Sequence, residues 1–495
     1  MLFLGIDLGT SSVKVSVIDG HSGKTISSVQ YPETESPVIS VKPGWAEQDP
    51  DQWWSDVQSA IHISHATQLY NPLDIKAIGI AYQMHGLVLV DKEQKVLRNS
   101  IIWCDSRAVE IGNRAFEAIG KETCLSHLLN SPGNFTASKL AWVKTFEPEI
   151  YESIDKVLLP GDFIAMRLTG AITTTASALS EGIFWDFKTA SLSKEVLNHF
   201  HFSTACFPEI KNVFQVHGII TPGVANKLMF ADDVVISYKA GDQPNNALSL
   251  NVLQPGEVAA TAGTSGVIYA VSDHLTYDHA SRVNSFAHVN HTGENIRTGV
   301  LLCINGTGSV NRWARQTIAG QLSYQQINAE ASGIAIGSEG LRVIPFGNGV
   351  ERMLDNKLVG AHLLHINLNQ HKPSHIFRAT QEGIACAMRY GLDIMRENNI
   401  HPTIIRAGHA NMFLSTVFAQ SFVNLTQVPV ELYHADGSVG AAIGAAIGVQ
   451  FYKNFSEAFI HQRAISIIEP DEVHASEALY QSWKKDLQQI MLNNR

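Results

Sequence analysis

The chain has 495 residues, of which 45% are hydrophobic and 17% charged, and its formal net charge is −10. These values exclude a small single module, a disordered chain and a collagen-like fibre, and they predict about two to four folded domains. Acidic residues outnumber basic ones, 46 to 36, with no local basic patch, so nucleic acid is not an expected partner.

The cysteines and the first residues predict a cytoplasmic protein. The five cysteines stand singly and form no Cys-x-x-Cys pair, a pattern that suits neither a disulfide framework nor a zinc knuckle. Residues 1–7 lack a basic segment, and Asp7 interrupts their apolar run, unlike a signal peptide. The apolar run 439–449 is about half the length of a membrane span. We therefore expect no membrane partner.

Two segments far apart in the chain predict related hairpins. Residues 2–18 alternate apolar and polar positions on both sides of Gly9-Thr10-Ser11, which is typical of a β-hairpin. Residues 258–271 repeat this pattern around Gly263-Thr264-Ser265. The repeat predicts two related halves that each open with such a hairpin, and we place them at residues 1–246 and 247–495.

The remaining segments alternate between strand and helix patterns. In chain order, the predicted elements are a helix over 49–69, strands over 75–81 and 87–90, helices over 136–146 and 375–399, a strand over 404–406 and helices over 411–424 and 437–449. Alternating strands and helices predict α/β layers. Aromatic residues at helical spacing (Trp53, Trp54, Trp142, Phe146) are expected in the core. Four histidines (His362, His365, His371, His375) are expected in a solvated polar loop.

The first hairpin carries residues that suit a phosphate tail with Mg²⁺. Asp7 ends a strand, and Gly9–Ser12 follow with amide N–H groups and hydroxyls. Such donors bind phosphate oxygens, and a carboxylate holds a hydrated metal ion. A turn that binds nothing is the alternative for one hairpin alone. The second copy at Gly263–Gly266 favours two loops that grip the β- and γ-phosphates from both sides of a cleft.

The two hairpins, together with residues Ile404–Asn411 and Asp436–Ala442, resemble the actin-like ATPase superfamily. Five further runs resemble one of its families, the FGGY carbohydrate kinases: Gln83–Asp91, Ser100–Arg107, Leu159–Phe163, Arg167–Gly170 and Ala240-Gly241-Asp242. Within the family, residues 83–86, together with residues 44–50 and Trp53-Trp54, are most similar to xylulokinases. The resemblance extends from residue 2 to about residue 450.

This resemblance implies an α/β fold of two actin-like (ribonuclease H-like) domains with a catalytic cleft between them. It implies that ATP and Mg²⁺ are used to phosphorylate a sugar or polyol, with Asp242 as the general base and Asp7 holding the metal through water. The implied sugar ligands are Gln83, Met84, His85, Asn134, Asp242 and Gln243. The implied ATP ligands are Thr10, Ser11, Ser12, Lys14, Gly263, Thr264, Ser265, Gly408 and Asn411.

The acceptor implied is D-xylulose, converted to D-xylulose 5-phosphate. Gln243 stands where xylulokinases typically have Asn, which leaves ribulose, gluconate, glycerol or another polyol as alternatives. Residues 406–410 differ from the family's Gly-Gly-Gly-Ala motif, so the nucleotide preference stays open. A nucleotide-binding regulator of the actin type without kinase activity is a further alternative. The expected partners are therefore a sugar or polyol and ATP, and a homodimer is an open alternative to a monomer.

Three of the implied sugar ligands also have simpler interpretations. Met84 and His85 could be core residues, and Asn134 or Thr136 could cap the helix predicted over 136–146.

Overall fold

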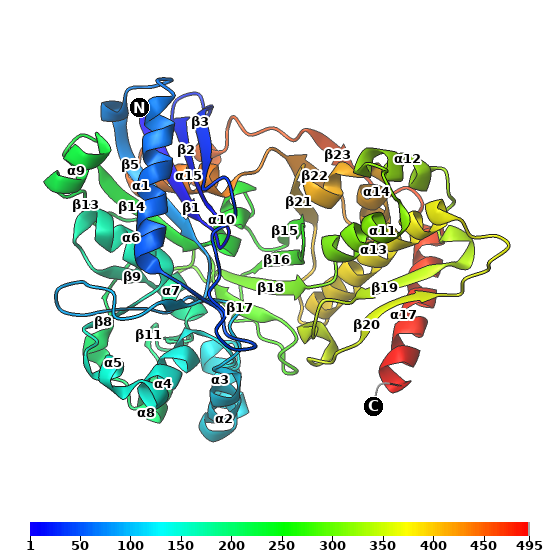
Figure 1. The fold of residues 1–495 in the computed structure, drawn as a ribbon, viewed down its shortest axis with the longest axis horizontal. Helices are drawn as coiled ribbons and strands as arrows, with labels where there is room; N and C mark the ends of the chain where they lie inside the picture. The colour runs from blue at the N-terminus through cyan, green and yellow to red at the C-terminus, as the bar shows by residue number, and fades with distance from the viewer. Residues whose placement is uncertain (494–495) are drawn as a thin grey trace.

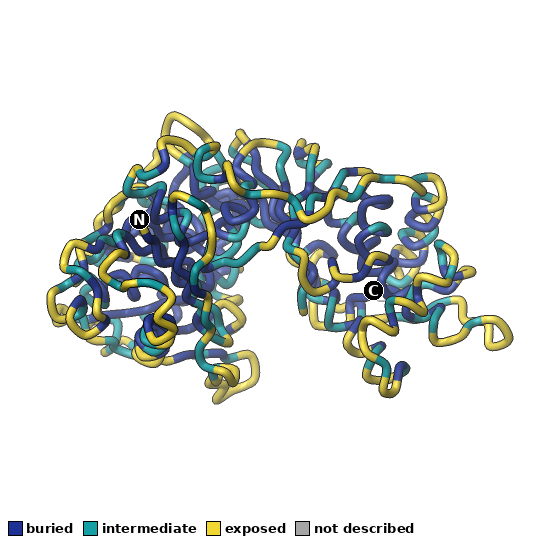
Figure 2. The backbone as a smooth tube through the Cα atoms, turned by 90° about the horizontal axis from the view of Figure 1, so that it is seen from above, coloured by how far each residue is buried: buried dark blue, intermediate teal, exposed yellow. Residues whose placement is uncertain are grey.

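The computed structural model describes residues 1–493 and has two lobes, each built around its own mixed β-sheet (Figure 1). Seen from above, buried backbone fills the centre of each lobe (Figure 2). The six-stranded first sheet has the order β13-β14-β5-β1-β2-β3. Its strands are β1 (Leu2–Leu8), β2 (Val13–Asp19), β3 (Thr25–Tyr31), β5 (Ile75–Tyr82), β13 (Gly218–Ile219) and β14 (Val235–Gly241).

The second sheet repeats the strand order of the first. Its seven strands have the order β17-β18-β16-β15-β21-β22-β23. The first sheet, read from β13, and the second, read from β23, both begin with an antiparallel edge strand. Two parallel strands, the hairpin and a further antiparallel strand follow in each. The second sheet has one additional antiparallel strand, β17, beyond these. The second set comprises β15 (Glu257–Ala262), β16 (Gly266–Ser272), β17 (Asn284–Ala287), β18 (Thr298–Ile304), β21 (Ile404–Gly408), β22 (Val430–Tyr433) and β23 (Ser466–Ile468). Both predicted hairpins and the two-domain actin-like α/β fold are confirmed.

Helices cover both faces of the first sheet, so its central strand β1 is almost wholly buried. The helices α1 (Pro50–Ala66) and α6 (Pro160–Thr169) pack on one face, and α10 (Asp242–Ser249) and α15 (Gly437–Gly448) lie over the other. Glycines in β1 and β5 permit the close approach of α15: a Cβ added at Gly5 would lie 1.8 Å from the Ser438 carbonyl oxygen, and one at Gly79 would lie 1.9 Å from that of Ala441. A helix late in the sequence therefore completes the first lobe (Figure 1).

The other helices form a subdomain of the first lobe and the body of the second lobe. The first lobe adds α2 (Val109–Ile119), α3 (Lys121–Leu128), α4 (Thr136–Phe146), α5 (Pro148–Glu152), α7 (Ala176–Glu181), α8 (Lys194–Phe200) and α9 (Pro222–Leu228). The second adds α11 (Gly308–Ile318), α12 (Tyr324–Ser332), α13 (Pro373–Glu397), α14 (Thr416–Thr426) and α17 (Val473–Asn493). The short helix α16 (Phe455–Ala458) follows α15 and packs against the first lobe. None of these described helices is long and apolar enough to span a membrane.

Short strand pairs and 3₁₀ turns connect these elements. The pairs are β4 (Glu47–Gln48) with β7 (Ser100–Ile101), β6 (Val88–Val90) with β8 (Lys156–Leu158), β9 (Thr173–Thr175) with β12 (Glu209–Lys211), β10 (Trp185–Asp186) with β11 (Ser191–Leu192), and β19 (Arg342–Phe346) with β20 (Gly360–Leu364). The 3₁₀ turns are η1 (Pro72–Asp74), η2 (Thr204–Cys206), η3 (Ser338–Gly340), η4 (Arg352–Leu354) and η5 (Asn411–Leu414).

The structure corrects three local predictions. The helix predicted over 411–424 is the turn η5 followed by α14, because Ser415 caps a new helix by accepting a hydrogen bond from the Phe418 amide. Phe146 is 61% exposed at the end of α4, although Trp53, Trp54 and Trp142 are buried as predicted. The four histidines do not share a solvated loop, since His362 lies in β20 and His375 is buried in the first turn of α13.

The domain boundary predicted between residues 246 and 247 lies within α10. The chain passes from the first sheet to the second between β14 and β15. The division into 1–246 and 247–495 stays a prediction, and α15 shows that the second part also contributes to the first lobe.

Candidate active site

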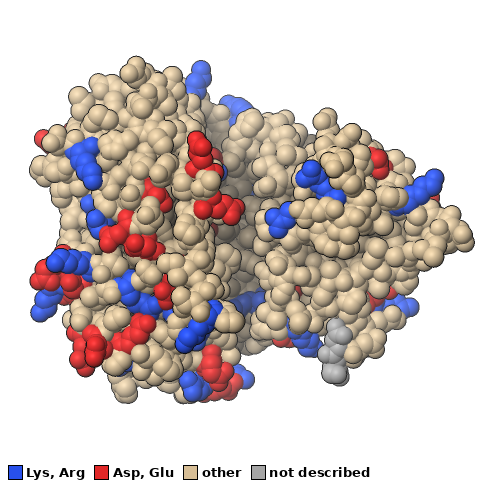
Figure 3. Space-filling model, in the orientation of Figure 1, with Lys and Arg blue, Asp and Glu red and all other residues tan. Residues whose placement is uncertain are grey.

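Three parallel strands bring the acidic residues of the first lobe to one edge of the sheet. Leu8 of β1 and Gly241 of β14 both pair with Tyr82, at the carboxyl end of β5. Asp7 and Asp242 therefore lie at the edge where ligands bind in open α/β sheets. This edge opens on a groove between the two lobes, which Figure 3 shows as a hollow in the surface.

Asp7 lies in a crowded acidic environment beneath the first hairpin. Burial, followed by the charge of Asp436, raises the pKa of the Asp7 carboxyl to about 6, although Lys14 opposes the shift. The Lys14 ammonium lies 3.9 Å from an Asp436 carboxylate oxygen. Asp436 also caps α15 by accepting hydrogen bonds from the amide and hydroxyl of Ser438. The structure therefore brings Asp7, Lys14 and Asp436 together at the start of α15.

Asp242 is the first residue of α10 and follows β14 directly. Burial raises the pKa of its carboxyl to about 7, the charge of Asp7 adds to this shift, and hydrogen bonds from Gln243 oppose it. Because the two carboxyls influence each other, the predicted base and the predicted metal ligand share one site. The Gln243 side-chain oxygen is buried and has no hydrogen-bond partner among the described residues.

Met84 and His85 form the wall beside Asp242. A Cβ added at Gly241 would lie 2.6 Å from Met84 Cγ, so this glycine lets Met84 pack over the strand end. The His85 Nδ1 atom lies 2.9 Å from the Glu181 carbonyl oxygen, which assigns the ring proton to Nδ1. Burial lowers the pKa of His85 to about 3, so the ring is neutral at pH 7. His85 Nε2 is therefore a hydrogen-bond acceptor.

Both lobes contribute to the surroundings of His85. Its ring centroid lies 4.8 Å from that of Phe135 in the first lobe and 5.3 Å from that of Phe286, on β17 of the second. The ammonium of buried Lys139 donates to the His85 carbonyl oxygen at 2.8 Å. Burial lowers the pKa of this lysine to about 7, and the charge of Asp105 opposes the shift. The sequence analysis missed Lys139, Glu181 and Phe286, and no sequence pattern marks them as site residues.

Asn134 does not cap α4. The N-cap position is Phe135, which makes no side-chain capping bond, so the capping interpretation of Asn134 and Thr136 is wrong. The Asn134 amide nitrogen instead donates to the Asp105 carbonyl oxygen. Its side-chain oxygen is buried without a partner among residues 1–493. Buried polar atoms are rarely left unpaired, so this acceptor is suited to a donor from a ligand.

Gln83 and Thr10 hold the first hairpin in place. The Thr10 hydroxyl donates to the Gln83 side-chain oxygen at 3.1 Å and accepts from the Trp103 indole at 2.9 Å. The Gln83 amide nitrogen donates to Gln48, and Gln83 is 2% exposed. Gln83 therefore lies behind the site, with its amide bonded within the protein. Ser11 is exposed at the tip of the same turn, and Ser12 is half-buried.

The second hairpin forms one wall of a pocket in the second lobe. This pocket has a volume of about 360 Å³ and is lined by Ala262, Gly263, Thr264, Gly308, Asn311, Arg312, Tyr324, Asn328, Asn411, Met412, Leu414 and Ser415. The structure thus brings Gly263, Thr264 and Asn411 together, whereas Ser265 and Gly408 are not among the lining residues. Asn311, Tyr324 and Asn328 were missed because they come from two helices whose placement only the fold decides.

A third glycine turn, missed in the sequence analysis, supports the second hairpin. The Gly308 amide donates to the Gly263 carbonyl oxygen at 2.9 Å, and the Thr307 hydroxyl lies 3.2 Å from the same oxygen. A Cβ added at Gly308 would lie 2.3 Å from that oxygen, so the close approach requires glycine. The signal was present as Gly306-Thr307-Gly308, which resembles the Gly-Thr-Ser of both hairpins.

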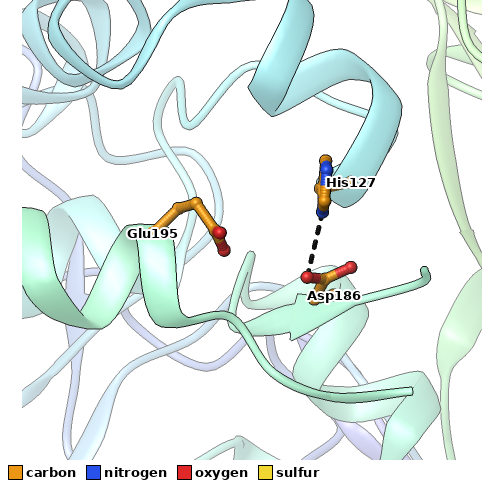
Figure 4. Close-up of side chains that lie close together, drawn as sticks. All are labelled: His127, Asp186 and Glu195. Atoms are coloured by element: carbon orange, nitrogen blue, oxygen red, sulfur yellow. Dashed lines mark hydrogen bonds and ion pairs between the residues drawn. The ribbon is translucent and has the colours of Figure 1, made fainter. Parts of the chain in front are cut away.

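One group of side chains outside the groove has metal-binding residue types. His127, Asp186 and Glu195 offer ligand atoms within 4.8 Å of one another (Figure 4). His127 Nδ1 lies 3.0 Å from Asp186, whose other oxygen accepts from the Lys188 amide, while Glu195 accepts from the Ser193 hydroxyl. These bonds explain the group as turn and helix-end stabilisation.

Comparisons with known proteins agree with this architecture. Residues 2–249 match the N-terminal domain model of the FGGY family of carbohydrate kinases, and residues 258–449 match its C-terminal domain model. The xylulose kinase of Escherichia coli K12 is 30% identical over 466 residues, which cover 93% of this chain and 92% of that protein.

Two crystal structures share the fold over essentially the whole chain. Ligand-bound xylulose kinase from Lactobacillus acidophilus has a TM-score of 0.90 at 23% identity, covering 100% of this chain and 99% of that one. Gluconate kinase from Lactobacillus acidophilus has a TM-score of 0.88 at 22% identity, also covering 100% and 99%.

Proposed function

We propose, from the premise that this chain belongs to the FGGY family of carbohydrate kinases, that it transfers the γ-phosphoryl group of ATP to the terminal hydroxyl of D-xylulose. The observation that carries the choice of acceptor is the 30% identity with a xylulose kinase over 93% of the chain. Gluconate, ribulose, glycerol or another polyol is the second candidate, because Gln243 stands beside the base where xylulokinases typically have Asn.

The groups around Asp242 suit a polyhydroxy substrate. The Gln243 and Asn134 side-chain oxygens are buried acceptors without a partner among the described residues, and His85 Nε2 is a further acceptor because the ring proton is on Nδ1. A sugar brings several hydroxyl donors, each of which would pair with one of these acceptors. A buried acceptor left unpaired costs about 1–3 kcal/mol, so filling this set favours a sugar over water.

Asp242 would align the terminal hydroxyl and accept its proton as the bond to phosphorus forms. Phosphoryl transfer depends mainly on positioning and charge neutralisation, with one carboxylate that orients the attacking oxygen. The two-lobed groove suits this chemistry, because lobes that close on the substrate exclude water from the transfer. The nucleotide would lie along the second hairpin, with its base and ribose in the pocket at Gly263, Thr264 and Asn411.

The acidic residues at the first hairpin fit Mg²⁺. Asp7 and Asp242 lie at one edge of the sheet, and Asp436 caps α15 beside them. Burial is the main cause of the raised pKa values of Asp7 and Asp242, and neighbouring carboxylates add to both shifts. Mg²⁺ prefers such oxygen ligands and usually keeps several waters. Asp7 would hold the ion through water, and Thr10, Ser11, Ser12 and Lys14 would face the phosphate tail. The bound ion would supply positive charge to the β- and γ-phosphates.

A coupled ADP-release assay over a panel of pentuloses, sugar acids and polyols tests this function. We expect the largest kcat/KM with D-xylulose. A larger value with gluconate, ribulose or glycerol would select the second candidate. ATP binding without acceptor-dependent ADP release would instead indicate a nucleotide-binding regulator.

Cellular location and assembly are further parts of the proposal. All five cysteines are free thiols, which suits the reducing cytoplasm where ATP is available. A homodimer stays a prediction, which light scattering of the purified chain would test.

We expect Gly408→Val to raise the KM for ATP by about tenfold, equivalent to about 1.4 kcal/mol of binding. Gly408 ends β21 next to the nucleotide pocket, and a Cβ there would meet only Ala435 at 3.5 Å. Its φ is not positive, so the backbone tolerates a side chain. The melting temperature should change by less than about 2 °C. A large fall in melting temperature with an unchanged KM would show that Gly408 is structural.

We expect kcat/KM for the sugar to rise with pH, with a midpoint near pH 7, and to level off about one pH unit above it. Only the ionised Asp242 carboxylate accepts a proton, and its raised pKa of about 7 leaves it increasingly protonated at lower pH. A pH profile with saturating ATP would measure the midpoint, and Asp242→Asn should remove it. A midpoint near 4, the ordinary aspartate value, would contradict the assignment.

A further inference from the structure

Arg352 is a half-buried cation of the second lobe that has no acidic partner among residues 1–493. Its guanidinium makes one long hydrogen bond, 3.5 Å to the Ser281 carbonyl oxygen. No carboxylate of residues 1–493 lies within salt-bridge distance of it. In contrast, the half-buried Arg282 pairs with Asp278 and Glu397. A buried charge without a partner is costly, so Arg352 is suited to an anionic ligand.

The neighbouring residue ties Arg352 to the second hairpin. Glu351 is 0% exposed, and both its carboxylate oxygens accept from the Asn305 amide, at 3.0 and 3.1 Å. Asn305 leads into the turn whose Thr307 and Gly308 bond to the Gly263 carbonyl oxygen. The turn η4, which begins at Arg352, therefore has a defined position relative to the predicted phosphate-binding loop.

The charge of Arg352 also acts on residues of the predicted sugar site. Its turn packs on β18, which carries the exposed Cys303. The Arg352 charge contributes to the lowered pKa of His85, although burial is the main cause. Burial raises the pKa of the Cys303 thiol to about 11, Arg352 opposes this shift, and Asp242 adds to it. Arg352 is thus a cation of the second lobe whose turn packs on the strand that carries Cys303, and its charge acts on both Cys303 and His85.

We propose that Arg352 is a catalytic residue that binds the equatorial oxygens of the phosphoryl group during its transfer. The proposal rests on the proposed function. In the step, the sugar hydroxyl oxygen forms a bond to the γ-phosphorus, and the bond between that phosphorus and the β–γ bridging oxygen breaks. Its electron pair leaves with ADP, and the hydroxyl proton moves to Asp242. Arg352 exchanges no proton, and its planar fork of donors matches phosphoryl oxygens.

The test compares Arg352→Ala and Arg352→Lys with the wild type. Because an interaction made mainly in the transition state lowers kcat rather than raising KM, we expect Arg352→Ala to lose about 10²–10³-fold in kcat. Its KM for the sugar and its Kd for ATP should stay within about threefold. Arg352→Lys should retain an intermediate kcat, and added guanidinium ion should partly restore Arg352→Ala. The control is Arg463→Ala, since Arg463 bonds only to carbonyl oxygens of its own segment, and it should match the wild type.

A second measurement uses ADP with aluminium fluoride and Mg²⁺, a mimic of the transferring phosphoryl group. Calorimetry should show tighter ADP binding with aluminium fluoride in the wild type, and this gain should be lost in Arg352→Ala. A kcat within about threefold of the wild type, or an equal loss of ATP affinity, would overturn the proposal. If Arg352→Ala does not fold, the comparison of Arg352→Lys with the wild type tests the proposal in both assays. If the wild type phosphorylates no acceptor, the proposed function is wrong. The measurement with aluminium fluoride would then still test whether Arg352 binds the phosphoryl group.

Discussion

Replacing Asp242 with Asn should lower kcat by about 10²–10⁴-fold, the usual contribution of a positioned general base. Asparagine keeps the size of the side chain and removes its basicity. Asp242 lies at the strand edge with a pKa raised to about 7 by burial and by Asp7, so it is poised to accept a proton near neutral pH. The rate of sugar-dependent ADP release, measured with saturating ATP and sugar, would give this value.

Asp7→Asn is the matched comparison, because it removes an acid from the same site. We expect it to raise the Mg²⁺ concentration needed for half-maximal rate and to weaken nucleotide binding. Asp242→Asn should leave ATP affinity almost unchanged. If the kcat of Asp242→Asn stays within about tenfold of the wild-type value, the loss is too small for removal of the general base. Another carboxylate of the groove would then have to be the general base.

Replacing Gly79 with Ala should destabilise the first lobe by about 1–3 kcal/mol, the usual cost of overpacking a buried site. A Cβ there would lie 1.9 Å from the Ala441 carbonyl oxygen. Since that atom belongs to the backbone of α15, the conflict cannot be relieved by a side-chain rotation. The melting temperature should fall by several degrees, as measured by circular dichroism.

The same substitution should also reduce activity, because a displaced α15 moves Asp436 and Gly437 away from Asp7. A Cβ added at Gly437 would lie 2.2 Å from an Asp7 carboxylate oxygen, so this contact is close. Gly223→Ala is the control, because a Cβ in this exposed turn of α9 meets nothing within 4 Å. It should keep or slightly raise the melting temperature. Equal stability of both variants would show that α15 does not pack tightly on β5.

Local patterns in the sequence were enough for the fold class and for the family. Period-two alternation around Gly9 and Gly263 predicted two hairpins, and each proved to be the start of a sheet with the same strand order. The run from Gln83 to Gly86 and Asp242 pointed to the family that the domain models match. These features could be predicted because strand periodicity and short motifs are local properties of the chain.

The arrangement of the site was decided only by the tertiary structure. No periodicity predicts that α15 packs on the first sheet, that Phe286 of the second lobe reaches His85, or that Arg352 has no acidic partner in the described part of the chain. The exposure of Phe146 and the unpaired oxygen of Asn134 likewise depend on neighbours distant in sequence. Burial, charge compensation and hydrogen-bond satisfaction are properties of surroundings, and the surroundings of these residues come from segments up to hundreds of residues away.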